Sequence, residues 1–173
     1  YCQYSSRYDA FRRGEVLNAF KKEFGNSALM DIGCYLVEAC VCLFGKPKSI
    51  SSKSVKLHNG FEAMGSAIFD YGDFIATLDW SKITESVNPS VIAGEDGSIL
   101  FGKISTLEYV KKRLKGQEEI TLLDKREESN MLYEVINFAD MICNNLPAKP
   151  FNDITLTSLE IMDYIRKENK INF

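Results

Sequence analysis

The most apolar part of the chain runs from residue 28 to residue 44 and has the composition of a buried helix. Only Asp31 and Glu38 carry charge within it, so apolar side chains cover nearly its whole circumference. Asn26 or Ser27, just before it, is a residue type that favours a helix N-cap. Such a helix belongs in a protein core, where a carboxylate is costly unless it is paired or used.

After this helix the apolar positions recur with a period of two, which is typical of β-strands. The clearest alternation is Phe74–Trp80, and Gly72 and Asp73 before it fit a tight two-residue turn. Residues 1–24 show no clean period and predict the end of a strand followed by a loop. The predicted strands are Ser49–Leu57, Ala63–Tyr71, Phe74–Trp80, Val87–Ala93, Ser98–Ile104, Leu107–Arg113 and Glu119–Leu123.

Helical spacing returns near the end of the chain. Met131–Cys143 carries one apolar face, and Ser129 or Asn130 can cap it. Thr157 and Glu160 have the spacing of a capping box, which predicts that a second helix opens there. The side chains expected to face inward from this second helix are Leu159, Met162 and Ile165.

The order of these elements is a helix, a run of antiparallel strands and two further helices. This order predicts an α+β fold, a large open mostly antiparallel sheet with helices packed on one face. Apolar residues also occur on the other face, for example Ile75 opposite Phe74 and Leu78. We therefore expect a second copy of the sheet to cover that face, which predicts a homo-oligomer.

The length and the charge balance narrow the classes of function. The 173 residues fit a single domain. Lysine and arginine total 21 and aspartate and glutamate 24, for a net charge of −3, which argues against a nucleic-acid partner. The apolar helix is shorter than the roughly 20 residues that a bilayer requires and contains two acids, so we expect no membrane span.

Cysteine and histidine usage argues against metal chemistry. The five cysteines are odd in number and sit mostly in apolar surroundings, and His58 is the only histidine. We expect no metal site and no disulfide framework, as in a reducing compartment. No basic and apolar leader is visible at the start of the sequence, so the predicted location is cytoplasmic.

The apolar helix carries one polar stripe, formed by Asp31, Tyr35 and Glu38 at helical spacing. One interpretation is a proton relay, in which Tyr35 exchanges a proton with a substrate oxygen and Asp31 orients Tyr35 or a neighbouring group. The alternative is that Asp31 caps the helix and Tyr35 is a core aromatic with a satisfied hydroxyl. Spacing alone favours the alternative.

The stretch "ALMDIGCY" resembles a signature at the start of the C-terminal domain in the Gfo/Idh/MocA (glucose–fructose oxidoreductase/inositol dehydrogenase) oxidoreductase family. That signature is Asp-x-Gly-x-His or Asp-x-Gly-x-Tyr, and here it reads Asp31-Ile32-Gly33-Cys34-Tyr35. The resemblance covers essentially the whole chain. It continues in "YSSRYDAFRRGEVLNAF", "LFGKPKSI", "DYGDFIATLDW", "IAGEDGSILF", "MLYEVINFADMI" and "SLEIMDYIRKENKINF".

The resemblance implies a domain that binds substrate and forms oligomers, following a Rossmann domain that binds NAD or NADP. By position, it implies that Tyr35 is the acid/base tyrosine and that Asp31 lies beside the substrate. Arg7, Arg12 and Arg13 lie in the loop where family members often place substrate contacts, and Arg12 and Arg13 are the candidate contacts, although solvated surface arginines are at least as good an interpretation. The chain differs from many members in having Gly25-Asn26-Ser27 where they have three glycines.

Two parts of the family's machinery have no counterpart in this sequence, namely the lysine of a Glu-Lys-Pro motif and a Gly-x-Gly-x-x-Gly after a strand. We therefore expect residues 1–173 to be a single C-terminal domain without its Rossmann domain, inactive by itself. The sequence does not assign roles to Arg7, Glu38, His58 or Trp80, although core or interface packing is favoured for the tryptophan.

The predicted function is the substrate-binding and oligomerisation domain of an NAD(P)-dependent oxidoreductase. Its substrate would be a carbohydrate-like small molecule, namely a sugar, polyol or dihydrodiol. One alternative is a standalone, non-catalytic binding or dimerisation module, and another is a member that binds cofactor without turnover. The substrate, the choice between NAD and NADP and the oligomeric state stay open at this point.

Overall fold

The computed structural model describes residues 1–124 and 131–172. The chain forms two compact units, of which the first combines Tyr1–Ser86 with the C-terminal helix from Phe151 onward. The second unit is Val87–Pro150. The predicted caps Ser129 and Asn130 lie outside the described residues.

The first unit contains a three-stranded antiparallel sheet in the order β1-β2-β3. Its strands are β1 (Ser49–Lys56), β2 (Glu62–Asp70) and β3 (Ile75–Ser81). The predicted tight turn between β2 and β3 is confirmed, because the N–H of Tyr71 donates to the carbonyl of Phe74 at 3.0 Å. Gly72, the first central residue of this turn, has φ of +95°, which favours glycine.

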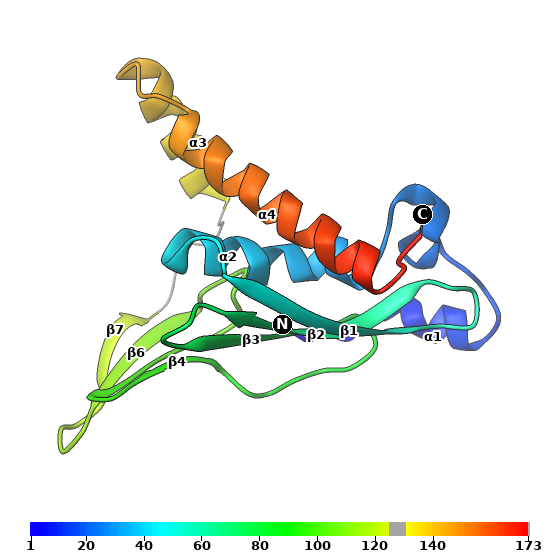
Figure 1. Cartoon of the computed structure of the whole chain (residues 1–173), viewed down its shortest axis with the longest axis horizontal. Helices are drawn as coiled ribbons and strands as arrows, with labels where there is room; N and C mark the ends of the chain where they lie inside the picture. Colours follow the sequence, from blue (N-terminus) through cyan, green and yellow to red (C-terminus); the bar gives the residue numbers. More distant parts are fainter. Residues whose placement is uncertain (125–130, 173) are drawn as a thin grey trace. The chain divides into compact units, whose positions relative to one another are not determined.

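Alternate residues of this sheet face the core, as the period-two pattern predicts. Ala67 and Phe69 of β2 and Leu78 and Trp80 of β3 are all buried. The core also takes in Val37 and Val41 of α2 (Cys34–Phe44) and Ile161 and Ile165 of α4 (Lys149–Glu168). Figure 1 shows α2 and α4 on the same side of β1, β2 and β3. These two helices therefore cover one face of the sheet.

The helix α4 corrects one prediction, because it begins at Lys149 and not near Thr157. Thr157 lies inside the helix, where its hydroxyl donates to the carbonyl of Asp153 at 2.8 Å, so it forms no capping box. Pro150 in the first turn suits a helix start, since its missing N–H would be unpaired there in any case. The buried face is Ser158, Ile161, Met162 and Ile165, whereas Leu159, expected to face inward, is 46% exposed.

The chain before the apolar helix contains short helices where a loop was predicted. They are α1 (Arg7–Arg12) and the 3-10 turns η1 (Asn18–Phe20) and η2 (Lys22–Phe24). Where the end of a strand was predicted, Cys2 forms an isolated parallel bridge with Ser81, and the N–H of Gln3 donates to the carbonyl of Ser81 at 2.9 Å.

One stretch within the described residues, Lys22–Phe44, is long and apolar enough to cross a membrane by length and composition. A core helix of a soluble protein passes the same test. This stretch places Val37 and Val41 in the core of the first unit, and its helical path is interrupted around Gly25, where φ is +70°. Of its most apolar window, 39% is buried within the protein, and Leu43 and Phe44 at its end are exposed.

The second unit is an antiparallel meander followed by a helix. Its strands pair in the order β4 (Ser90–Gly94), β5 (Gly97–Phe101), β6 (Tyr109–Leu114) and β7 (Ile120–Asp124). The helix α3 (Met131–Cys143) has the predicted bounds, and none of its residues is buried. The α+β class with antiparallel strands is thus confirmed, and the strands are hydrogen-bonded as two sheets of three and four.

Candidate functional site

The candidate site is built at the start of the apolar helix, where Ser27 acts as the cap. Its hydroxyl accepts the N–H of Met30 at 3.1 Å, and its carbonyl accepts the N–H of Asp31 at 3.1 Å. Asn26 instead donates from its side chain to the carbonyl of Asn18 at 3.2 Å. Of the two predicted caps, the structure selects Ser27.

The helix begins with a π-helical turn, η3 (Leu29–Gly33), which carries Asp31 and leads directly into α2. The glycine of the signature has a packing reason here. A Cβ on Gly33 would lie 3.1 Å from Cδ1 of Leu29 and 3.3 Å from Cγ of Trp80. Single π turns of this kind are frequent at functional sites. Glycine therefore lets this turn lie against the tryptophan.

Trp80 is a core residue, which confirms the packing that the sequence favoured for it. It is fully buried, and its indole N–H donates to Oε1 of Glu62 at 2.8 Å. Gly65, opposite Trp80 in the sheet, accommodates the ring, because a Cβ there would lie 2.5 Å from Cζ2 of the indole.

Glu62 is a buried carboxylate that the sequence did not single out. Besides the indole N–H it accepts the backbone N–H of Leu29 at 2.9 Å, so it ties the sheet to the start of the helix. Burial raises the pKa of Glu62, and the N–H donors of Leu29 and Trp80 oppose that rise in pKa. No local pattern marks this glutamate, since its partners come from two other elements.

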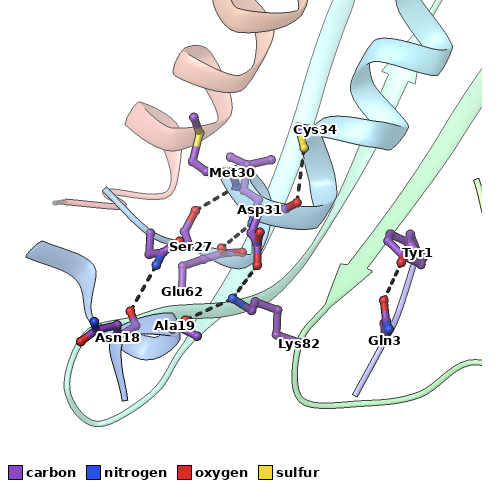
Figure 2. Close-up of polar contacts among 12 residues, drawn as sticks. Tyr1, Gln3, Asn18, Ala19, Ser27, Met30, Asp31, Cys34, Glu62 and Lys82 are labelled. Atoms are coloured by element: carbon purple, nitrogen blue, oxygen red, sulfur yellow. Dashed lines mark hydrogen bonds and ion pairs between the residues drawn. The ribbon is translucent and has the colours of Figure 1, made fainter. Parts of the chain in front are cut away.

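Asp31 forms an ion pair with Lys82, which sequence reasoning also missed. The Lys82 ammonium lies 2.7 Å from Oδ2 of Asp31 and donates to the carbonyl of Ala19 at 3.1 Å. Figure 2 shows Lys82 reaching both residues. The Lys82 side chain is 6% exposed and that of Asp31 50%, so a buried cation holds a half-exposed carboxylate.

Tyr35 lies one turn after Asp31, in the first turn of α2. It is 46% exposed, so it is not a buried core aromatic, and its ring meets that of Tyr1 edge-on at a centroid distance of 6.1 Å. Glu38, the third member of the predicted stripe, is exposed. The structure thus presents both Asp31 and Tyr35 to solvent.

A cleft of about 740 Å³ opens beside Asp31. The residues that line it are Arg7, Val16, Leu17, Asn18, Ala19, Lys21, Phe24, Asn26, Asp31 and Lys82. Among the described residues, Asp31 is the one acid in this lining, which also contains the cations Arg7, Lys21 and Lys82. A lining that contains arginine, asparagine and carboxylate groups suits a ligand that both donates and accepts hydrogen bonds.

Arg12 and Arg13, the predicted substrate contacts, are exposed at the end of α1 and are not among the residues that line this cleft. Arg7, from the first turn of the same helix, does line the cleft. The ring of His58 packs on that of Phe11, at a centroid distance of 4.7 Å.

Within residues 1–124 and 131–172, no three histidine, cysteine or acidic side chains come together as a metal site. All five cysteines are free thiols. Burial raises the pKa of Cys40 to about 11 and also raises the pKa of Cys34 above its usual value. Neither thiol is therefore a thiolate near neutral pH, the form that binds metals and attacks electrophiles.

Known proteins resemble this chain in sequence and in fold. The scyllo-inositol 2-dehydrogenase (NADP(+)) IolU of Bacillus subtilis (strain 168) is 41% identical over 172 residues, covering 97% of this chain and 52% of that protein. The uncharacterized oxidoreductase YgjR of Escherichia coli (strain K12) is 36% identical over 173 residues, covering 100% of this chain and 53% of that protein. The chain therefore spans about half the length of these relatives.

Solved structures share the fold at lower identity. The UDP-N-acetylglucosamine 3-dehydrogenase GnnA of Acidithiobacillus ferrooxidans superposes with a TM-score of 0.67 and 14% identity, covering 86% of this chain and 50% of that one. A sequence model of the GFO/IDH/MocA C-terminal domain matches residues 2–100, which include the signature Asp31–Tyr35 and Lys82. The chain belongs to the GFO/IDH/MocA C-terminal domain family of oxidoreductases.

Proposed function

We propose that this chain is the substrate-binding and oligomerisation domain of an NAD(P)-dependent oxidoreductase acting on a sugar, polyol or dihydrodiol-type hydroxyl or carbonyl group. One observation carries the proposal. A half-exposed carboxylate, Asp31, lies at a cleft one helical turn from a half-exposed phenol, Tyr35, in a chain of this family. The relative IolU, whose name gives scyllo-inositol and NADP(+), supports a polyhydroxylated substrate.

In this proposal the two signature residues divide the work on the substrate. Tyr35 gives or takes the proton of the reacting oxygen, because a phenol in this position can serve as a general acid or base. Asp31 accepts a hydrogen bond from a substrate hydroxyl and so fixes the orientation of the substrate. Arg12 and Arg13 are proposed as further substrate contacts, and Arg12→Ala and Arg13→Ala are each expected to raise KM.

The dinucleotide-binding motif of a Rossmann domain does not occur in this sequence. The sequence contains no Gly-x-Gly-x-x-Gly after a strand, and the segment "GEDGSILFG" forms the turn and strand β5 instead of a helix start. We propose that NAD or NADP is held mainly by a Rossmann domain preceding residues 1–173, in the same cytoplasmic polypeptide. The nicotinamide supplies the redox chemistry, and this chain by itself is expected to be inactive.

The oligomerisation part of the proposal rests on the exposed face of β1, β2 and β3. Val55, Ile68 and Ile75 are large apolar residues on these strands that are all exposed. A second copy of this face would remove them from water. Ile68→Lys is expected to shift the full-length protein to a smaller species in size-exclusion chromatography, and an unchanged mass would contradict this part.

The catalytic part is tested by Tyr35→Phe in the full-length protein. Turnover of scyllo-inositol, other polyols, aldoses and a trans-dihydrodiol is measured with NAD⁺ and NADP⁺. We expect kcat to fall by about 10²- to 10⁴-fold, the usual contribution of a general acid or base. Tyr164→Phe, at an exposed position of α4, is the matched control and should retain turnover. Unchanged turnover in Tyr35→Phe would remove Tyr35 from the mechanism.

A second candidate is a standalone binding or dimerisation module without catalysis, and the exposed apolar sheet face is the observation that favours it. The reading frame upstream of Tyr1 separates the two candidates. About 120 codons with a nucleotide-binding pattern would favour the enzyme, whereas a start codon directly before Tyr1 would favour the module.

A further inference from the structure

Lys82 joins three segments that are far apart in the sequence. Its backbone directly follows β3, its ammonium pairs with Asp31 at 2.7 Å, and it donates to the carbonyl of Ala19 at 3.1 Å. The same nitrogen lies 5.4 Å and 5.5 Å from the ring centroids of Phe20 and Phe61. Two oxygens and two aromatic faces thus surround an ammonium whose side chain is 6% exposed. Two of its three N–H donors are therefore used by the protein itself.

The Asp31 carboxylate is held at one oxygen and open at the other. Lys82 contacts Oδ2, while among the described residues no donor reaches Oδ1. Asp31 is half exposed and lines the cleft, so Oδ1 is available to accept a hydrogen bond from a ligand. Fixing one oxygen fixes the plane of the carboxylate and therefore the direction in which the other oxygen accepts.

Through its hydrogen bond to Ala19, Lys82 also contacts a segment that lines the cleft. The carbonyl of Ala19 belongs to the 3-10 turn η1, and Asn18 and Ala19 of this turn both line the cleft. Burying an ammonium is costly, and an apolar side chain of similar length would pack between Phe20 and Phe61 without that cost. The oxygens that the ammonium holds give a reason for a lysine at this position.

We propose that Lys82 is a positioning residue, which orients the Asp31 carboxylate toward a substrate hydroxyl and fixes the η1 wall of the cleft. The expected effect on catalysis rests on the proposed function. The contacts by which Lys82 holds Asp31 and Ala19, here called the clamp, do not depend on it. We assign Lys82 a positioning role because two of its three N–H donors are directed at Asp31 and Ala19 of the protein itself. The ligand it prepares the cleft for is one with a hydroxyl that donates to Oδ1, such as a polyol.

The first test is steady-state kinetics of the full-length enzyme with scyllo-inositol and NADP⁺. We expect Lys82→Met to lower kcat/KM by about 10- to 100-fold, mainly through kcat, because orientation of the carboxylate is lost. Lys82→Arg keeps the charge and should recover part of this loss. Lys46→Met breaks an exposed ion pair with Glu160 in the same unit and should change neither constant.

A double-mutant cycle separates positioning from general support of the fold. In the Asp31→Asn background, Lys82→Met should change kcat/KM less than about threefold, because the group it orients has already been altered. The same loss in both backgrounds would overturn the proposal, since it would show that Lys82 acts independently of Asp31.

The second test does not depend on turnover. Amide hydrogen exchange of the full-length protein should be faster in Lys82→Met than in wild type at residues 17–21 and 29–33, and unchanged in Lys46→Met. Unchanged exchange at these segments would overturn the clamp. If the wild-type enzyme turns over no compound of the panel, the proposed function fails, while the exchange measurement still decides whether Lys82 holds Ala19 and Asp31.

Discussion

Glu62 and Trp80 form a buried hydrogen bond of 2.8 Å between neighbouring strands, from the indole N–H to the carboxylate. The other carboxylate oxygen accepts the N–H of Leu29, at the start of the π-helical turn. The turn that carries Asp31 is therefore attached to the sheet by a side chain that lies outside the signature. Because this attachment is buried, its loss is expected to affect stability before it affects chemistry.

Replacing Glu62 with glutamine should destabilise the protein. The amide side chain has one acceptor oxygen and two N–H groups, so one of the two donors that Glu62 satisfies loses its partner in a buried site. We expect a loss of about 1–3 kcal/mol in the free energy of unfolding, measured by thermal or urea unfolding. Glu160→Gln, in the exposed pair with Lys46, is the control and should cost less than about 1 kcal/mol. An equal effect of the two substitutions would contradict this account.

Glu62 also gives the stability a dependence on pH. Burial raises the pKa of Glu62 above the usual value of 4.5, so between the two pKa values the folded protein binds more protons than the unfolded chain. The stability that Glu62 contributes is thus greatest below pH 4.5 and is lost as the pH rises through the folded pKa. The destabilisation by Glu62→Gln should consequently shrink with rising pH, and urea unfolding of both proteins across this range measures it. A penalty that grows with pH would contradict the sign.

Gly65→Ala should destabilise the sheet through Trp80. The new Cβ would lie 2.5 Å from Cζ2 of the indole and 3.0 Å from the carbonyl of Lys53, so the ring or the strand must move. We expect a cost of about 1–3 kcal/mol, read as a lower unfolding temperature. Gly94→Ala is the control, because its nearest neighbour is the carbonyl of Gly97 at 3.7 Å. A melting temperature equal to that of this control would show that the indole has room to shift.

Thr157→Ala tests the corrected start of α4. Because Thr157 lies inside the helix and bonds back to Asp153, alanine should change the free energy of unfolding by less than about 0.5 kcal/mol. Loss of a true N-cap would cost about 1 kcal/mol. Thermal unfolding of the variant distinguishes the two, and a cost near the larger value would restore the capping box.

Local patterns were sufficient for most of the secondary structure. The alternation of Phe74–Trp80 and the tight turn at Gly72 depend on residues close together in the chain, and both are found in the structure. The start of α4 was misplaced because the spacing of Thr157 and Glu160 is the same whether the two residues lie at the N-terminus of a helix or inside it. The helix start near Pro150 carries a weaker local signal, since proline also marks turns.

The sequence by itself determined the α+β class, the apolar helix with a cap at Asn26 or Ser27, the signature Asp31–Tyr35 and, through them, the family. These features depend on residue types and short spacings, which the chain order alone expresses. Only the tertiary structure decided that Lys82 pairs with Asp31, that Ser27 is the cap, that Glu62 holds the helix start and that Arg7 lines the cleft. The physical reason is that burial and ion pairing depend on which distant segments of the chain pack together, and the spacing of neighbouring residues does not indicate this packing.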